Sequence, residues 1–139
     1  MIPNVEILEG SAGPWTVEKF EVTGILGSFR DAFSGRYCPP GTYTRLKHTA
    51  RGIVMSDTPA EKNDHYTFVR KAAGHVLING LGIGMCLNAV LKKDGVTKVT
   101  VVEIDADVIR LVGPNYSSDE RVEIIHSSAF DYRPPKGIR

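Results

Sequence analysis

Two groups of residues in this sequence have types and spacings that could bind a ligand. They are three alternating glycines and two acids, each group following a short apolar run: Gly80, Gly82, Gly84, Glu103 and Asp105. Glycine adopts positive φ and lets the backbone approach a ligand without a side chain in the way. Glu103 follows Gly84 at close to the roughly 20 residues expected for an acid that binds the two hydroxyls of a ribose.

The surrounding pattern predicts the elements that would bring these two groups together. Apolar runs predict strands near 76–79 and 99–103, and an amphipathic segment predicts a helix near 84–93. Asp94-Gly95 then supplies a polar stop and a helix-ending glycine. Strand, glycine turn, helix, strand and acid, in this order, are typical of a nucleotide-binding βαβ unit.

The spacing of the glycines distinguishes between cofactor classes. A dinucleotide fingerprint that starts at Gly80 needs a glycine where Met85 stands, and the Gly-Lys-Ser/Thr triplet of a P-loop does not occur. The pattern that stands is G-x-G-x-G, in the segment 80–84. An NAD-binding oxidoreductase domain is therefore disfavoured, and it remains one of the alternatives.

The segments NGLGIG and VVEID resemble motif I and the following strand of class I S-adenosylmethionine-dependent methyltransferases, most closely those of the spermidine-synthase-like branch. The resemblance implies S-adenosylmethionine over the glycine turn, its ribose on Glu103, Ile104 against the adenine, and Ser128-Ala129 at the adenine edge. The cofactor-binding residues that it implies are Gly80, Leu81, Gly82, Gly84, Glu103, Ile104, Ser128 and Ala129.

The sequence departs from the family pattern at three points. Ser128 stands where the family usually has an aspartate that binds the adenine, and Ile78 stands where many methyltransferases carry an acid. The spermidine-synthase-like branch also has an apolar residue at the second of these positions. The matched region, 58–130, covers only the cofactor half, and the acids with which strand four of this family handles an amine have no counterpart in it. A fragment that lacks the catalytic half is one of the alternatives, beside a sheet completed by a second copy of the chain or covered by the N-terminal portion. No catalytic residue is assigned.

Three functional hypotheses follow. The first is a methyltransferase-like or aminopropyltransferase-like enzyme with an unknown acceptor, and the second is a non-catalytic S-adenosylmethionine-binding or assembly module. The third is the NAD-binding domain. We expect this chain alone to show little or no methyl or aminopropyl transfer. The first parallel strand would have an unpaired flank, which we expect to be covered by a second copy of the chain or by the N-terminal portion.

Composition excludes several other classes. The 139 residues suffice for one domain with a core, and the net charge of +1 gives no electrostatic support for a nucleic-acid or membrane partner. Cys38 and Cys86 form no disulfide framework or metal-binding motif, so no metal site is predicted. No segment reads as a transmembrane helix or signal peptide, and a cytoplasmic location is the default expectation.

The fold class expected is α/β: a Rossmann-like parallel sheet, as a partial methyltransferase core, preceded by a small β-rich N-terminal portion. The division is predicted at 1–56 and 57–139. Alternation predicts strands within 4–25 and 42–56, with turn material at 10–14. Three aromatic residues of this portion are expected in the core, and a substrate pocket is the alternative: Trp15, Tyr37 and Tyr43.

Three further elements complete the expected parallel unit. They are a helix at 59–73, a helix at 106–112 capped by Asp105, and a third strand at 122–126. Thr58 and Glu61 predict a capping box for the first helix. We expect that helix to bury Tyr66 and Val69, with Ala73 as a further candidate. The family places substrate or cofactor contacts near Asp57, Asp64 and His65, although capping by Asp57 and a surface position for His65 are at least as well supported.

Overall fold

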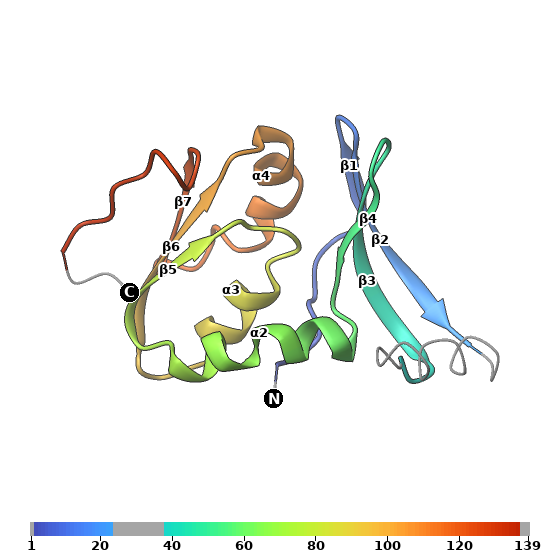
Figure 1. Ribbon diagram of the computed structural model, residues 1–139, viewed down its shortest axis with the longest axis horizontal. Coiled ribbons are helices and arrows are strands. Elements are labelled where there is room, and N and C mark those ends of the chain that lie inside the picture. The colour runs from blue at the N-terminus through green and yellow to red at the C-terminus, as the bar shows by residue number, and fades with distance from the viewer. Residues whose placement is uncertain (1, 24–37, 137–139) are drawn as a thin grey trace.

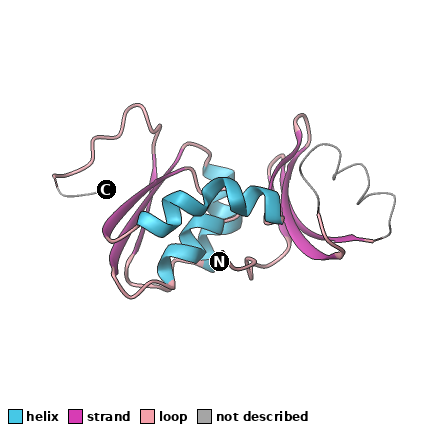
Figure 2. Cartoon of the chain, turned by 60° about the horizontal axis from the view of Figure 1, so that its bottom comes forward, coloured by secondary structure: helices cyan, strands magenta, loops and turns pink. Residues whose placement is uncertain are grey.

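The computed structural model describes residues 2–23 and 38–136. In this part of the chain an antiparallel sheet and a parallel sheet lie on opposite sides of a layer of α-helices (Figure 1). Figure 2, turned by 60°, shows the same three layers. The predicted α/β class, with a parallel sheet after a β-rich portion, is therefore confirmed.

The antiparallel sheet consists of β1 (Gly10–Ala12), β2 (Trp15–Val22), β3 (Gly41–His48) and β4 (Gly52–Ser56), in that order. The prediction of turn material at 10–14 is wrong for its first three residues, because they pair with β2 as far as Ala12 opposite Trp15. A hydrogen bond between the hydroxyls of Ser11 and Thr16, 3.0 Å apart, joins the two strands. The turn shrinks to Gly13-Pro14. Residues 24–37, which include Ile25 and Tyr37, lie outside the described part.

The parallel sheet consists of β5 (Gly74–Asn79), β6 (Val96–Glu103) and β7 (Val122–His126), in the order β5-β6-β7. The connections carry α3 (Met85–Leu91) and α4 (Ala106–Val112), with the short 3-10 helix η1 (Gly113–Asn115) after α4. This βαβαβ succession and strand order match one half of a Rossmann fold. The predicted parallel pairing of the first two strands is confirmed.

Helix α2 (Pro59–Lys71) precedes β5 and begins where the sequence predicts, but its predicted capping box is wrong. The N-cap residue Thr58 makes no side-chain capping hydrogen bond. Glu61 instead accepts hydrogen bonds from the Ser56 backbone N–H at 3.0 Å and from the Ser56 hydroxyl at 2.8 Å. The acid therefore ties the first turn of α2 to the end of β4.

The predicted buried face of α2 is right at one position only. Val69 is buried, whereas Tyr66 is 47% exposed and Ala73 lies beyond the helix on the surface. The helix ends early because Ala72 is extended. The Lys93 ammonium donates to the carbonyls of residues 69, 70 and 72 at 2.7 to 2.9 Å, so a side chain from beyond α3 caps the end of α2.

One hydrophobic core joins the two sheets. It contains Trp15, Val17 and Leu46 from the antiparallel sheet together with residues of the helices and of the parallel sheet, such as Leu87 and Val101. The change from antiparallel to α/β structure falls between Ser56 and Pro59. The division into two domains near residue 56 stays a prediction.

The outer flank of β5 has no strand neighbour within residues 2–23 and 38–136. The N-terminal strands form a separate sheet and, among the described residues, make no strand pairing with this flank. Cover by a second copy of the chain stays a prediction. Among the described residues, no helix combines the length and the apolar character that crossing a bilayer requires.

Candidate functional site

The predicted glycine turn lies at the carboxyl end of β5, the edge at which open parallel sheets bind ligands. Gly80, Gly82 and Gly84 all have positive φ, at 95°, 54° and 79°. The Gly80 N–H donates to the carbonyl of Val102 on β6 at 2.7 Å, and the Gly84 N–H donates to the Leu81 carbonyl at 2.8 Å. The first bond holds the turn against the neighbouring strand, and the second closes the turn itself.

Gly84 is buried beneath Tyr116 and does not face solvent. A Cβ at this position would overlap the tyrosine ring. The Tyr116 hydroxyl donates to the Ile83 carbonyl at 2.9 Å, and burial, assisted by the negative charge of Asp57, raises the pKa of this phenol. Gly84 therefore serves the packing of the turn onto the protein interior.

Gly82 meets the antiparallel sheet. A Cβ there would overlap the sulfur of Met55, which projects from β4. The thioether therefore closes off space directly above the turn. A Gly80 Cβ, in contrast, would meet no atom within 4 Å. The open side of the turn thus lies at Gly80.

Glu103 ends β6 beside the turn, and its side chain is directly bonded to it. One carboxylate oxygen accepts the Leu81 N–H at 2.7 Å, and the other accepts the Asp105 N–H at 3.0 Å. The residue is only 8% exposed. The Ser127 N–H, after β7, donates to the Glu103 carbonyl at 3.1 Å. Because each carboxylate oxygen can accept two hydrogen bonds, each retains one acceptor position.

The remaining predicted residues lie at the carboxyl ends of β6 and β7. Ile104 is 68% exposed, and its carbonyl accepts a hydrogen bond from His126 Nε2 at 2.9 Å. The Ser128 hydroxyl accepts the Phe130 N–H at 3.2 Å, and Ala129 is exposed. The fold therefore gathers these residues and Glu103 along one edge of the parallel sheet.

A cavity of about 600 Å³ opens on the other side of the glycine turn, between β4, α2 and β5. Of the predicted cofactor-binding residues, Gly80, Leu81 and Gly82 line it. The remaining lining residues are Val54, Met55, Glu61, His65, Phe68, Leu77, Ile78, Asn79 and Cys86. The turn thus separates an acid-bearing edge from a largely apolar cavity.

Three side chains of the cavity can carry a charge or a reactive group. The Glu61 carboxylate is engaged by Ser56, as described above, and His65 is half-buried. Burial raises the pKa of the Cys86 thiol, so this side chain lines the cavity in its neutral form. Within the described ranges, no cluster of three or more His, Cys, Asp or Glu side chains is arranged to hold a metal ion.

Asp57 is a structural residue. It is fully buried, and its carboxylate accepts the N–H groups of Val5 at 3.0 Å and Thr44 at 2.7 Å. The prediction that Asp57 caps α2 is wrong, because the N-cap of that helix is Thr58. The carboxylate ties the N-terminal segment to β3 immediately before α2.

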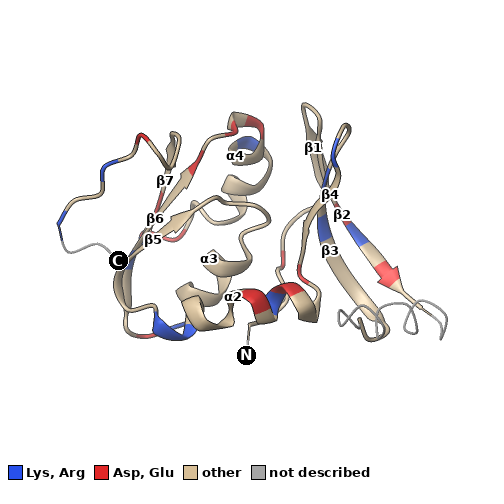
Figure 3. Cartoon of the chain, viewed as in Figure 1, with Lys and Arg blue, Asp and Glu red and all other residues tan. Residues whose placement is uncertain are grey.

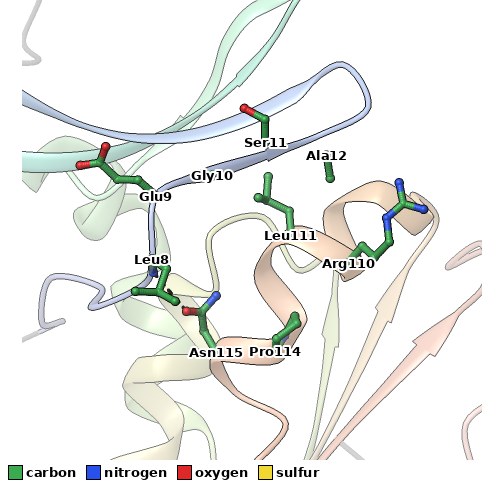
Figure 4. Close-up of a pocket in the computed structure, with 9 residues that line it drawn as sticks. All are labelled: Leu8, Glu9, Gly10, Ser11, Ala12, Arg110, Leu111, Pro114 and Asn115. Atoms are coloured by element: carbon green, nitrogen blue, oxygen red, sulfur yellow. Dashed lines mark hydrogen bonds between the residues drawn. The ribbon is translucent and has the colours of Figure 1, made fainter.

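A second cavity, of about 430 Å³, lies between α4 and the segment that leads into β1 (Figure 4). The Leu8 N–H donates to the Asn115 side-chain oxygen across it at 3.1 Å. Arg110 at its rim is paired with Asp107. None of the predicted cofactor-binding residues lines this cavity.

Sequence reasoning missed the residues that the antiparallel sheet brings to the site. Val54 and Met55 arrive on β4, and no local pattern connects them to a turn some 25 residues further along the chain. Trp15 and Tyr43 are buried, as expected. Trp15 nevertheless reaches the β6 end, since its indole N–H donates to Asp105 at 2.9 Å. Figure 3 shows acidic and basic residues spread over both described sheets.

Comparisons with known proteins find similarity at the level of structure only. No protein-family model matches the sequence, and neither does any curated protein. The chain is similar to a spermidine synthase in complex with the transition-state analogue AdoDATO, with 25% identity and a TM-score of 0.41. It is equally similar to the spermidine synthase from Thermotoga maritima, with 25% identity and a TM-score of 0.40. Each match covers 63% of this chain and 37% of the other. Such low TM-scores do not assign a fold, which rests here on the strand order.

Proposed function

We propose that this chain binds S-adenosylmethionine, or a closely related adenosyl sulfonium, and serves methyl or aminopropyl transfer to an acceptor that remains to be identified. One observation carries the proposal. The Glu103 carboxylate accepts the Leu81 N–H at 2.7 Å, so the acid and the glycine turn form one unit at the carboxyl edge of the parallel sheet.

The chemistry of this unit suits an adenosyl group. The Glu103 carboxylate retains two acceptor positions, one for each ribose hydroxyl, and hydrogen bonds to an ionised acceptor are the stronger kind. Exposed Ile104 offers an apolar surface beside the acid for a base ring. The Ser128 hydroxyl, which already accepts the Phe130 N–H, keeps its own hydrogen to donate to a ring nitrogen.

The sulfonium end would then extend past Gly80 toward the cavity of about 600 Å³. Cavities of this size with mostly apolar linings are usual for small-molecule sites. In the transfer, the lone pair of an acceptor nucleophile forms the new bond to carbon. The carbon–sulfur bond breaks, and its electron pair leaves on a neutral thioether. The leaving group therefore needs no proton, and the acceptor's proton passes to a base.

A non-catalytic S-adenosylmethionine-binding module is the second candidate. It is favoured by the state of Glu61, the one carboxylate in the described lining of the cavity, which accepts hydrogen bonds from Ser56 and is held as a structural group. Incubation with S-adenosylmethionine and candidate amines separates the two candidates, because only the enzyme releases the thioether product. The NAD-binding alternative is less well supported, since Met85 is a fully buried core residue.

A thermal-shift comparison of cofactors tests the proposal. A ligand at about 100 times its Kd stabilises the folded protein by about 2.7 kcal/mol, which raises the Tm of a domain of this size by several degrees. We expect this shift with S-adenosylmethionine and S-adenosylhomocysteine and none with NAD. A shift with NAD alone would support the oxidoreductase alternative, and no shift with any adenosyl ligand would refute nucleoside binding at the turn.

A further inference from the structure

The indole of Trp15 connects the antiparallel sheet to the acid-bearing edge of the parallel sheet. Trp15 begins β2 and is 5% exposed, and its N–H donates to Asp105 Oδ2 at 2.9 Å. The two residues are 90 positions apart in the sequence. The hydrogen bond therefore fixes one sheet against the loop that follows β6.

Asp105 is hydrogen-bonded both to the start of α4 and to Glu103. Its other carboxylate oxygen accepts the N–H groups of Asp107 at 2.8 Å and Val108 at 3.3 Å, and so caps α4. Its own backbone N–H donates to Glu103 at 3.0 Å. The side chain thus holds the peptide whose N–H orients the Glu103 carboxylate.

We propose that Trp15 is a positioning residue for the cofactor site, acting through Asp105 to orient the Glu103 carboxylate toward the glycine turn. The chain of contacts runs from the Trp15 indole to the Asp105 side chain, from the Asp105 N–H to one Glu103 oxygen, and from the other oxygen to the Leu81 N–H. The expected effect of Trp15 on cofactor affinity rests on the proposed function. The expected effect on the Leu81–Glu103 hydrogen bond rests on geometry alone.

The start of this chain of contacts is rigid. The Trp15 ring lies edge-on to the His48 ring, with centroids 4.7 Å apart, and the Arg51 guanidinium lies 5.4 Å from the indole centroid. Burial raises the pKa of Asp105, but the hydrogen bonds from Trp15 and the α4 backbone, together with the charge of Arg51, outweigh it. The pKa of Asp105 therefore lies below its usual range, and the acceptor is ionised.

A second restraint limits the size of the effect. The Ser127 N–H holds the Glu103 carbonyl at 3.1 Å, and His126 holds the Ile104 carbonyl at 2.9 Å. The backbone of this loop is therefore also fastened to β7. Loss of the indole hydrogen bond should loosen the Glu103 side chain without displacing the strand.

The matched variants are Trp15→Phe and Tyr43→Phe. The first keeps an aromatic ring and removes the N–H that Asp105 accepts. The second removes the hydroxyl that donates to the Pro39 carbonyl at 2.9 Å, in the same sheet but remote from the turn. Amide hydrogen exchange of each variant without ligand is the first measurement. We expect the Leu81 amide to exchange about three- to tenfold faster in Trp15→Phe, as the loss of one hydrogen bond implies.

The Val101 amide, in the centre of β6, should be unchanged in both variants and reports any global loosening. The Leu81 amide should also be unchanged in Tyr43→Phe. Equal Leu81 protection in Trp15→Phe and the parent would overturn the positioning role, whatever the protein binds. An equal increase in the exchange rates of the Leu81 and Val101 amides in Trp15→Phe would also overturn it, because the loosening would then be global.

The second measurement is a double-mutant cycle on S-adenosylmethionine affinity. Trp15→Phe should weaken binding about three- to tenfold in the parent. The same change should have no further effect in a Glu103→Ala background, because the group that it positions is absent. Additive losses would show that Trp15 acts by another route and would overturn the inference. The two proposals can also fail separately. If the Leu81 amide exchanges faster in Trp15→Phe but the parent binds no adenosyl ligand, the positioning geometry is upheld and the proposed function is overturned.

Discussion

The two sheets reach the glycine turn in different ways. The parallel sheet holds it from within its own βαβ unit, through the Val102 backbone carbonyl and the Glu103 carboxylate. The antiparallel sheet reaches the same region with side chains, Met55 over Gly82 and Trp15 on Asp105. The first set of contacts comes from residues of the same strand–turn–strand unit, whereas the second depends on side chains from strands that are distant in the sequence.

This difference separates two properties of the site. The parallel unit supplies the turn and the acid, on which the proposed adenosyl site depends. The antiparallel sheet supplies the far wall of the cavity through Val54 and Met55. We therefore expect changes within the parallel unit to alter the fold and the proposed cofactor affinity directly, and changes at Val54 or Met55 to alter what fits beside the cofactor.

The largest expected effect comes from breaking the junction of the two regions at Asp57. Asp57→Ala leaves the buried N–H groups of Val5 and Thr44 without an acceptor. Each buried unsatisfied group costs about 1–3 kcal/mol, so the loss of an acceptor for two of them should lower the free energy of unfolding by about 2–6 kcal/mol. Urea unfolding measures it. The control is Asp94→Ala, at an exposed position. An equal loss of unfolding free energy in the two variants would contradict the role of Asp57 in tying the N-terminal segment to β3.

The next effect distinguishes two glycines of the turn. Gly84→Ala forces positive φ on alanine and drives its Cβ into the buried Tyr116 ring, which together should cost about 2–4 kcal/mol. Gly80→Ala imposes positive φ in open space and should cost about 1–2 kcal/mol. The two unfolding free energies should therefore differ. If Gly80→Ala proved the more damaging, the packing of the turn described here would be wrong.

A smaller effect tests the lysine that caps α2. Lys93→Met keeps most of the aliphatic chain and removes the ammonium that serves three carbonyls at the end of the helix. The loss should be about 1–2 kcal/mol, in the range of a helix cap or of a hydrogen bond to a charged group. Lys92→Met, at the neighbouring exposed position, is the control and should lie within about 0.5 kcal/mol of the parent.

The smallest effect is a pH dependence at the contact between the two sheets. The folded pKa of Asp105 is lowered, so its stabilising contribution is present above the ordinary aspartate pKa of about 3.9 and is lost as the pH falls through the folded value. Its size should be below about 1 kcal/mol, because the charge is partly screened by solvent. Asp105→Asn should lose stability less steeply than the parent between about pH 5 and pH 2. Identical slopes in acid denaturation would show that Asp105 is not stabilised as an anion.

The elements of the parallel unit could be predicted because their signals are local. An apolar run, a glycine turn and a capping acid such as Asp105 fix strands and helices through neighbours only a few residues away. The failures involve partners distant in the sequence. Residues 10–12 became a strand because β2 pairs with them, and Tyr66 stayed exposed because no described element covers that side of α2. Glu61 bonded Ser56 instead of completing a capping box.

The candidate site divides in the same way. Gly80, Gly82 and Glu103 could be selected from spacing alone, since strand and turn lengths set where they lie. The hydrogen bond from Leu81 to Glu103 could not, because it depends on side-chain geometry. A cofactor contact at Gly84 stays a prediction, and the packing of this glycine under Tyr116 is a role that its place in the motif does not reveal. Met55 and Trp15 carry no local signal, because only the fold brings them to the turn.

Calorimetric titration of S-adenosylmethionine into the parent and into Glu103→Ala tests the central claim most directly. Removing a two-pronged, charge-assisted contact is worth on the order of 2–3 kcal/mol, so Glu103→Ala should bind roughly 30- to 150-fold more weakly than the parent. Circular dichroism confirms beforehand that both proteins are folded at the temperature of the titration. A parent that binds S-adenosylmethionine with an affinity that Glu103→Ala retains would contradict the assignment of the ribose to Glu103.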